Sequence, residues 1–406
     1  MRVHLALRRG LIYLLPFALL FVALIGRVAA PDLLERLSLF CFDIYQKAAP
    51  REAGDVPIRV VDIDDGSLSQ IGQWPWPRSV VAQLVDKLRE AGVAVVAFDI
   101  DFAEPNRTSP QLLLPLLARN GVRPEEAERL LAVVPDPDQR LAEAMAASRS
   151  RPGETRLPLP KAGFVWVGDD PLGRIANYSA AVFDLPQLEA AAAGNGFLNL
   201  SVDWDQVVRR VPLILRLGEA YPSPVAETLR VALGASTYVG RTAGANGEQS
   251  FGEKTGLTAI RIGSLTIPTD AAGRVWLHYA MPRRDRSVSA ADVLSGSFDP
   301  ALFADHIVLV GTSAAGVVND LQATPIAPDV PGVEIHAQLL EQLLQGAFLV
   351  RSDWAVGAEI LFTLLVGIGL ILALPRIGAL PSAALGGASV AIAFRGLMAP
   401  LQTRNC

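Results

Sequence analysis

The stretch that most constrains the fold runs from Arg59 to Pro105, where two apolar runs enclose a helical pattern. The runs, Ile58 to Ile63 and Val93 to Ile100, are rich in β-branched residues, which is typical of buried strands. Apolar residues between them recur at helical spacing: Val81, Leu84, Val85 and Leu88. A crossover of roughly 30 residues can join two parallel strands, which helices then cover on both faces. The sequence therefore predicts an α/β fold, a mixed sheet with a central parallel βαβ unit and helices on its faces.

Both predicted strands end in acidic residues. They are Asp62, Asp64 and Asp65 after the first strand, and Asp99, Asp101 and Glu104 after the second. Because ligands usually bind at the carboxyl ends of parallel strands, we expect these side chains to contribute to a ligand site. Divalent cations prefer carboxylate oxygens, so the candidate metal ligands are Asp62, Asp64, Asp99 and Asp101. The alternative is that some of them cap the following helix or turn and others pair with Arg78.

A rigid aromatic run precedes the predicted helix. Trp74, Trp76 and Arg78 belong to a Trp-Pro-Trp-Pro-Arg sequence in which prolines restrict the backbone and aromatic rings supply a large contact area. These three residues are candidate ligand contacts, and the run would serve as a ligand lid or a dimer contact. The alternative is a hydrophobic plug over the sheet, with Pro77 starting the helix.

Three residues in the last third of the soluble region complete the candidate ligand site. Thr312 and Ser313 follow a buried-strand pattern, Ile307 to Val310, in a small-residue turn into an expected helix whose free N–H groups would bind an anion. The spacing matches neither the Walker loop nor the dinucleotide fingerprint. His336 is a candidate metal ligand or base, with capping or packing as the alternative.

Composition excludes several classes of protein. The chain has 406 residues, 51% of them apolar, and a net charge of −5 without an interior basic block, so we expect no nucleic-acid partner. The two cysteines, Cys41 and Cys406, exclude a disulfide framework and have no metal-ligand spacing. No cofactor is indicated beyond the candidate divalent cation.

Apolar segments at both ends predict a multi-pass membrane protein. Residues 1–30 contain an uncharged run after Arg8 and Arg9 and are predicted to be a signal anchor, since Pro31 disfavours cleavage as a signal peptide. A helix and linker follow at 31–57, and 58–353 form the main domain. Two more spans are expected at 354–375 and 376–396, before a short tail at 397–406 with no output domain. Arg376, between those spans, agrees with a cytoplasmic turn.

The main domain carries further patterns. Residues 107–160 are predicted to be an excursion with three helices, and residues 331–346 form a helix that Gly346 ends. Residues 196–200 and 207–217 are expected to pair as a hairpin. The polar residues between and within those strands are predicted to form a turn with a solvated strand: Asp203, Asp205, Arg209 and Arg210. The strand at Ile307 to Val310 is the expected sheet neighbour of the opening unit.

The order of these parts resembles the CHASE-2 domain family, an extracellular sensory module of bacterial receptors. The matching pieces are VVDIDDGSLSQIGQWPWPRSVVAQLVDKL, AGVAVVAFDIDFAEP, GFLNLSVDWDQVVRRVPLI, SAADVLSG, IVLVGTSAAGVVND and PGVEIHAQLLEQLLQG, which together span about 300 residues. The resemblance implies a domain outside the bacterial inner membrane, flanked by membrane spans. It also implies a cytoplasmic output domain, which is a nucleotide cyclase, histidine kinase, Ser/Thr kinase or diguanylate cyclase.

Three departures from the family accompany this resemblance. Gln206 stands where the family usually has a glycine after the second aspartate of the polar turn, and the 107–160 excursion is longer than expected. Two carboxyl-terminal spans replace the usual three, and no output domain follows. A truncated chain, a frameshift and a separately encoded effector would each account for this.

The leading hypothesis is therefore a membrane-bound sensor that detects a small-molecule or ion signal. It would act through a missing or separately encoded cytoplasmic effector, and homodimerisation is compatible with it. One rival is an exported metal-dependent hydrolase that uses the strand-end aspartates. The other is a membrane assembly module that regulates a kinase or cyclase, in which Gly367, Gly369, Ala373, Gly386 and Gly387 would suit close helix packing.

Overall fold

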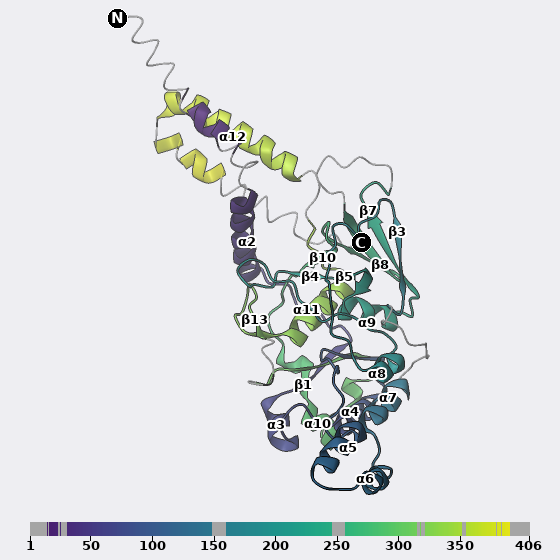
Figure 1. Cartoon of the computed structure of the whole chain (residues 1–406). Helices are drawn as coiled ribbons and strands as arrows, with labels where there is room; N and C mark the ends of the chain where they lie inside the picture. The colour runs from purple at the N-terminus through teal and green to yellow at the C-terminus, as the bar shows by residue number, and fades with distance from the viewer. Residues whose placement is uncertain are drawn as a thin grey trace, which may run out of the picture.

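The fold is built on two sheets and a helix between them (Figure 1). The computed structural model describes residues 31–147, 160–245, 256–314, 321–350 and 355–378, together with parts of 14–25 and 380–389 and residue 317. Within these residues the chain alternates helices and strands, so the predicted α/β class is confirmed.

The first sheet has four parallel strands in the order β11-β1-β12-β2. These strands are β1 (Ile58–Ile63), β2 (Val95–Phe98), β11 (Ser287–Ser289) and β12 (Ile307–Thr312). The predicted βαβ unit is present, but its two strands are not neighbours. Instead β12 lies between them, with Val310 opposite Val61 and Val308 opposite Val96. The expectation that the strand at 307–310 joins this sheet is confirmed.

Helices cover both faces of this sheet. The predicted helix is α4 (Arg78–Glu90), and its four apolar residues are buried as expected. It packs with α10 (Ala290–Ser295) against Val61, Ile63, Val308 and Val310 on one face, close to α3 (Asp65–Ile71). On the other face, Val60 and Leu309 contact Val333 and Ala337 of α11 (Gly332–Gln345).

The helix α11 is the central element of the domain. Its leucines Leu339, Leu340 and Leu343 are fully buried in a second core, which they share with the other sheet. That sheet has the order β3-β7-β8-β9, formed by β3 (Gly163–Val167), β7 (Thr237–Thr242), β8 (Leu257–Ile262) and β9 (Leu265–Pro268). The helix ends as predicted at Gly346, whose φ of 67° allows the left-handed cap.

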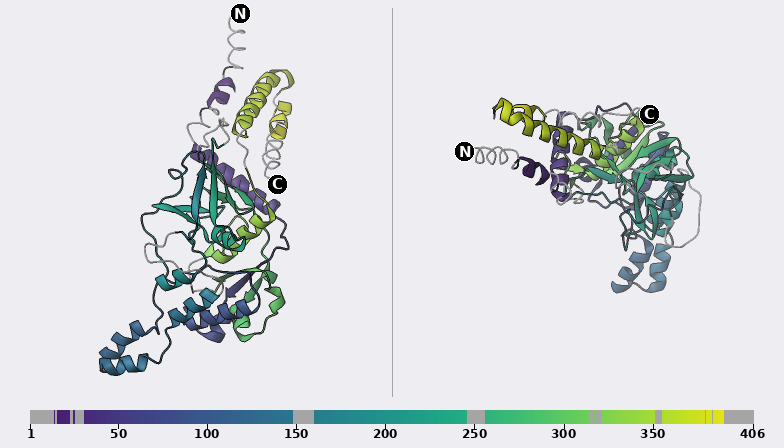
Figure 2. Two further views of the ribbon diagram at one scale, coloured as in Figure 1. Left: turned by 90° about the vertical axis from the view of Figure 1, so that its right-hand side faces the viewer. Right: turned by 90° about the horizontal axis from the view of Figure 1, so that it is seen from above.

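The three helices predicted within residues 107–160 are present. They are α5 (Pro110–Arg119), α6 (Pro124–Leu131) and α7 (Pro137–Ala147). Leu141 and Ala144 of α7 pack against Val81 and Val85 of α4, and Leu188 of α8 (Pro186–Ala191) joins them. Figure 2 shows α5 and α6 projecting beyond the domain at the end opposite α12.

The predicted hairpin of residues 196–200 with 207–217 is reduced to a single antiparallel bridge, between Ser201 and Arg210. Residues 196–200 themselves form no strand, and Gly196 lies against the start of α9 (Pro224–Ala232). A Cβ atom at Gly196 would lie 2.8 Å from the nitrogen of Pro224. Residues 210–217 pair elsewhere, β4 (Arg210–Pro212) with β10 (Arg274–Trp276) and β5 (Ile214–Leu217) with β6 (Glu219–Pro222). The remaining short elements are η1 (Arg284–Arg286), η2 (Pro300–Leu302), β13 (Leu321–Gln322) and β14 (Val330–Pro331).

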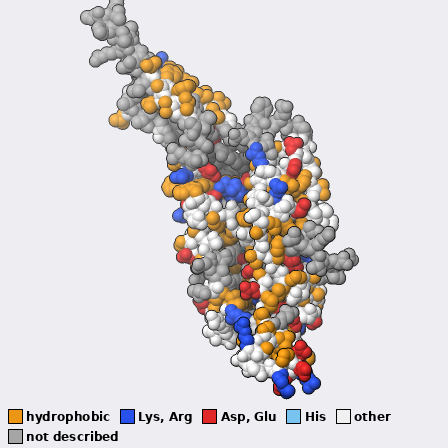
Figure 3. Space-filling model, in the orientation of Figure 1, with side chains coloured by type: hydrophobic (Ala, Val, Ile, Leu, Met, Phe, Trp, Pro, Cys, Tyr) orange, Lys and Arg blue, Asp and Glu red, His pale blue; other side chains and the backbone are white. Residues whose placement is uncertain are grey.

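Two helices lie at the ends of the domain, α2 (Pro31–Ala48) and α12 (Ala355–Ile377). Apolar side chains gather over α12 in Figure 3. The first predicted span lies largely outside the described residues, as does the second half of the last one. Among the residues that the structure describes, no helix is both long and apolar enough to cross a membrane.

Gln206 adopts the backbone conformation that favours glycine. Its φ is 63°, in the turn that the amide of Gln206 closes onto the carbonyl oxygen of Asp203 at 2.9 Å. The left-handed conformation costs an L-residue roughly 1–2 kcal/mol, which a glycine avoids. The turn therefore forms with a strained residue at this position.

Replacing this residue tests the strain directly. Gln206→Gly should raise the free energy of unfolding by about 0.5–1 kcal/mol, since relief of strain exceeds the entropy that glycine adds to the unfolded chain. Urea unfolding measures the change, with Gln206→Ala as the control that keeps the Cβ atom. A Gly variant no more stable than the Ala variant would contradict the assigned backbone geometry.

Candidate functional site

The carboxylates at the edge of the parallel sheet bind the chain's own hydrogen-bond donors. Asp62, at the end of β1, accepts bonds from the amide of Ser313 at 2.9 Å and from its hydroxyl at 2.6 Å. Asp64 caps α3 by accepting from the amide of Ser67 at 2.7 Å, and the hydroxyl of Ser289 donates to it at 2.9 Å. Burial raises the pKa of Asp62, whereas the bonds from Ser67 and Ser289 outweigh burial and lower the pKa of Asp64.

The candidate metal site does not form. In the described part of the chain, no three carboxylate, histidine or cysteine side chains converge as metal ligands would. Asp65 and Asp101 are exposed, and Asp64 is occupied in capping. The carboxylates of a cation site must share one centre, and the four candidate aspartates, all within the described residues, do not.

Arg78 and the tryptophans also serve the fold. The guanidinium of Arg78 lies 3.6 Å from Asp138, at the start of α7, and 4.4 Å above the ring of Phe102. Trp76 is buried in the core beneath α4, and its indole N–H donates to the carbonyl of Gly72 at 2.9 Å. Trp74 meets Trp76 edge to face with ring centres 5.5 Å apart. The packing of the two tryptophans agrees with the alternative interpretation, in which this run is a hydrophobic plug over the sheet.

Other candidate residues are joined to the same edge. The hydroxyl of Thr312 donates to the carbonyl of Ile63 at 2.9 Å. Residues 313 and 314 are irregular, and the rest of the expected anion-binding turn lies outside the described residues. Nδ1 of His336 on α11 lies 3.1 Å from Oδ1 of Asp99, which follows β2, and both side chains are buried. This pair holds α11 to the end of a strand two positions from β1.

Two cavities lie away from the strand edge. One of about 430 Å³ is lined by Leu198, Asn199, Leu200, Val202, Gln206 and Gln322. A second, of about 160 Å³, shares Asn199 and Leu200 with it and also borders Arg174, Tyr178 and Arg274. None of the sequence-predicted site residues lines either cavity. The strand-edge residues border neither of these two cavities.

An extended segment, Trp276–Ala280, is bound by side-chain amides on both edges. On one edge Gln46 of α2 donates to the carbonyl of Leu277 and accepts from the amide of Tyr279, each at 3.0 Å. On the other edge Gln342 of α11 accepts from the amide of His278 at 2.8 Å and donates to the carbonyl of Trp276 at 2.9 Å. Gln338 completes this edge with bonds to the backbone of Ala280. Because a glutamine amide has the same donor and acceptor as a peptide group, the three residues act as strand partners.

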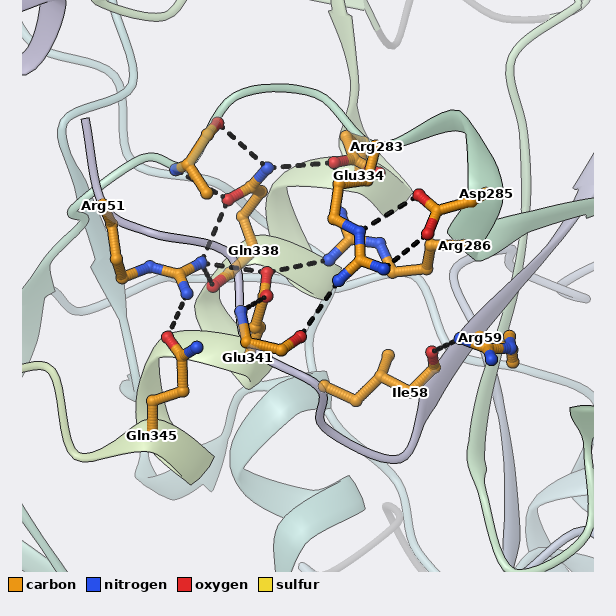
Figure 4. Close-up of polar contacts among 12 residues, drawn as sticks. Arg51, Ile58, Arg59, Arg283, Asp285, Arg286, Glu334, Gln338, Glu341 and Gln345 are labelled. Carbon is orange, nitrogen blue, oxygen red and sulfur yellow. Dashed lines mark hydrogen bonds and ion pairs between the residues drawn. The ribbon is translucent and has the colours of Figure 1, made fainter.

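Charged groups extend this contact (Figure 4). Arg51, three residues after α2, and Arg286, before β11, each bind one oxygen of Glu341 on α11 at 3.0 Å. The other oxygen accepts from the amide of Gly54 at 2.9 Å. Arg286 also binds Glu334. Burial would raise the pKa of Glu341, but its hydrogen bonds, chiefly from Arg51, lower it, so the carboxylate is held ionised.

Arg209 fixes α2 at a second point. It donates to both oxygens of Asp43 on α2 at 2.7 Å, to Asp205 at 2.7 and 2.9 Å, and to Asp203 at 3.1 Å. Its side chain is only 2% exposed, so the expectation of a solvated strand here is wrong. Burial opposes its charge, but the bonds to Asp43, Asp205 and Asp203 raise the pKa of Arg209 above its ordinary value.

We define the α2–α11 junction as this contact region: Asp43, Gln46, Arg51, Arg209, residues 276–280, Arg286, Glu334, Gln338, Glu341 and Gln342. Sequence reasoning did not identify it. The available signal was the row Glu334, Gln338, Glu341 and Gln345 on one side of α11, which reads equally well as a solvated face. The row is buried because residues 276–280 and Arg51, which are remote from it in the sequence, cover it.

In this domain α2, near its start, and α11, near its end, are bound to one core. Comparison with known protein families matches residues 17–369 to the CHASE2 domain. The match covers most of the 406 residues, so the chain belongs to the CHASE2 family, whose domains are sensory. No curated protein and no solved structure matches the chain.

Breaking the charge balance around Arg209 should be costly. Arg209→Met leaves Asp203, Asp205 and Asp43 without their shared cation, and loss of one partner from a buried ionic cluster destabilises by about 3–5 kcal/mol. Urea unfolding measures this loss. Lys87→Gln, which removes an exposed ion pair with Glu90, should change stability by less than about 1 kcal/mol. Equal effects of the two substitutions would show that the Arg209 cluster is not stabilising.

The same variant should change the acid dependence of stability. Hydrogen bonds from Arg209 lower the pKa of Asp205, so this stabilisation is present above the unfolded pKa of about 3.9 and is lost as pH falls through the lower folded value. Arg209→Met should therefore flatten the acid side of the stability profile.

His278 should add a separate dependence nearer neutral pH. Its Nε2 lies 3.1 Å from the carbonyl of Ala49, and burial, together with the charge of Arg51, lowers its pKa. A histidine with a lowered folded pKa favours unfolding when protonated, so stability should fall as pH drops below about 6.5. His278→Gln keeps a donor for Ala49 but does not titrate, and unfolding at pH 7.5 and 5.0 should show a smaller loss. An unchanged loss would assign the effect to another group.

Proposed function

We propose that this CHASE2 protein is a membrane-bound bacterial sensor whose main domain lies outside the cytoplasm. The domain detects a small-molecule or ion signal and passes it through α2 and α11 to the apolar segments that flank it in the sequence. A cytoplasmic kinase or cyclase, encoded separately or downstream, receives the signal. Family membership supports the sensory role.

The observation that carries this proposal is the α2–α11 junction. α2 follows the first apolar segment of the sequence, and α11 precedes α12 and the last ones. Both helices bind the same five-residue segment, Trp276–Ala280, through fully or almost fully buried glutamines. A displacement of this segment would change the position of α2 relative to α11, which is the geometry that a signal between the two flanks requires.

The larger cavity offers a place for the signal to enter. Val202 and Gln206 line it, and they flank Asp203 and Asp205 in the turn that binds Arg209. Arg209 in turn binds Asp43 of α2. A ligand in this cavity would contact the turn and shift α2 through two ion pairs. Its wall carries neutral amides and apolar groups, which favours an uncharged polar ligand.

The membrane topology is the first test. In the full chain with Cys41→Ser and Cys406→Ser, a cysteine placed at Val133, an exposed residue after α6, should react with a membrane-impermeant maleimide in intact spheroplasts. A cysteine at Arg376 is the control and should react only in inverted vesicles, since the proposal places this residue in the cytoplasm. Gel-shift labelling reports both. Reaction at Val133→Cys only in inverted vesicles would refute the proposed location.

A further inference from the structure

The outward face of α2 is apolar. Leu34, Leu37, Phe40 and Ile44 are 37%, 53%, 62% and 40% exposed, and Cys41 lies half-buried among them. Figures 1 and 2 show α2 at one flank of the domain. A contiguous exposed apolar patch on a folded domain marks a contact surface.

The opposite face of the same helix is already occupied. Leu39, Phe42, Tyr45 and Gln46 are buried against the domain, and the ring of Phe42 lies 4.9 Å from that of Trp276. The domain therefore binds a face of α2 that combines apolar residues with Gln46, and a second apolar stripe is left outside. A helix that is apolar on both faces needs a partner on each.

The spacing of the exposed residues is that of a helix-pairing seam. Leu34, Leu37, Cys41 and Ile44 follow one another at intervals of three, four and three residues, as positions a and d do in a coiled coil. Ala48 continues the series by four residues. A seam with this repeat fits a second helix of the same kind.

Charge favours a second copy of this chain over a lipid surface. Asp43 binds Arg209, Glu35 lies 3.4 Å from Arg210, and Arg36 stacks on Trp204 at 4.5 Å. These three charged groups of α2 thus have partners on the domain, and none of them belongs to the apolar seam. A helix that lies on anionic lipid carries several lysines or arginines beside its apolar face, and here Lys47 is the remaining basic residue of α2.

We infer that α2 pairs with α2 of a second copy about a two-fold axis, through Leu34, Leu37, Cys41 and Ile44. In this arrangement Cys41 lies opposite Cys41 of the partner copy. The dimer brings together the two helices that the domains hold through Asp43 and Gln46. A change in the domain then alters how the two α2 helices cross.

Oxidative cross-linking tests the contact. In the full-length chain with Cys406→Ser, purified in a mild detergent, Cys41 is the sole cysteine, and copper phenanthroline should give a disulfide-linked dimer on non-reducing gels. The control carries Cys41→Ser, Cys406→Ser and Glu35→Cys, which places an accessible cysteine outside the seam and should stay monomeric on the gel. Equal cross-linking of the two variants would mean random collision and overturn the inference.

A charge in the seam tests the same contact without a cysteine. Leu37→Glu, at an exposed position that leaves the core intact, should lower the association constant of the dimer at least tenfold in sedimentation experiments. Val133→Glu, at an exposed apolar residue away from α2, should leave it unchanged. A chain that is monomeric before any substitution would overturn the inference. So would a Cys41 that liposomes protect from maleimide but that does not cross-link, since this result assigns the face to lipid.

Discussion

The backbone of Trp276–Ala280 depends on side-chain amides for many of its hydrogen bonds, beside the pairing of Trp276 with β4 and the backbone bonds to Arg209 and Arg51. A buried peptide group without a partner costs about 1–3 kcal/mol, so the groups that the glutamines bind stay satisfied only while α2 and α11 remain in register with this segment. Gln46 forms hydrogen bonds to one edge of the segment, and Gln342 and Gln338 form them to the other. The position of α2, the course of this segment and the placement of α11 are therefore set together rather than one by one.

Buried charges reinforce that arrangement in a particular way. Glu341 joins two arginines from distant parts of the chain, and Arg209 joins three aspartates, one of them on α2. Such clusters contribute little net stability compared with apolar packing, because each ion loses its water. They do destabilise any other alignment of α2 and α11, since a shift by one helical turn would leave a buried charge unpaired. The charged groups of the junction thus contribute more by disfavouring other alignments of α2 and α11 than by adding to the free energy of unfolding.

Local patterns could predict much of this fold. The helical spacing of Val81, Leu84, Val85 and Leu88 placed α4 with its buried face correctly, and Gly346 ended α11 where a helix cap was expected. The order of the strands could not be predicted in the same way, because β12 enters the sheet from over 200 residues away. The burial of Arg209 and Gln342 was not predicted for a related reason, since it depends on partners that are remote in sequence.

The strand-end aspartates show the opposite case, in which the position was predicted but the role was not. Their position at the sheet edge was correct, but nearby serine hydroxyls and amides bind them, so position alone did not specify a cation site.

The insertion of β12 between β1 and β2 also bears on how the chain is synthesised. β1 and β2 share no hydrogen bonds with each other, and each pairs with β12. The backbone edges of β1 and β2 that face β12 therefore stay unpaired until residues 307–312 have been synthesised, after more than two thirds of the chain has been made. Contacts of such long sequence separation slow folding and prolong the exposure of strand edges. α4 can form early beside β1, but the sheet can be completed only when residues 307–312 insert between its strands.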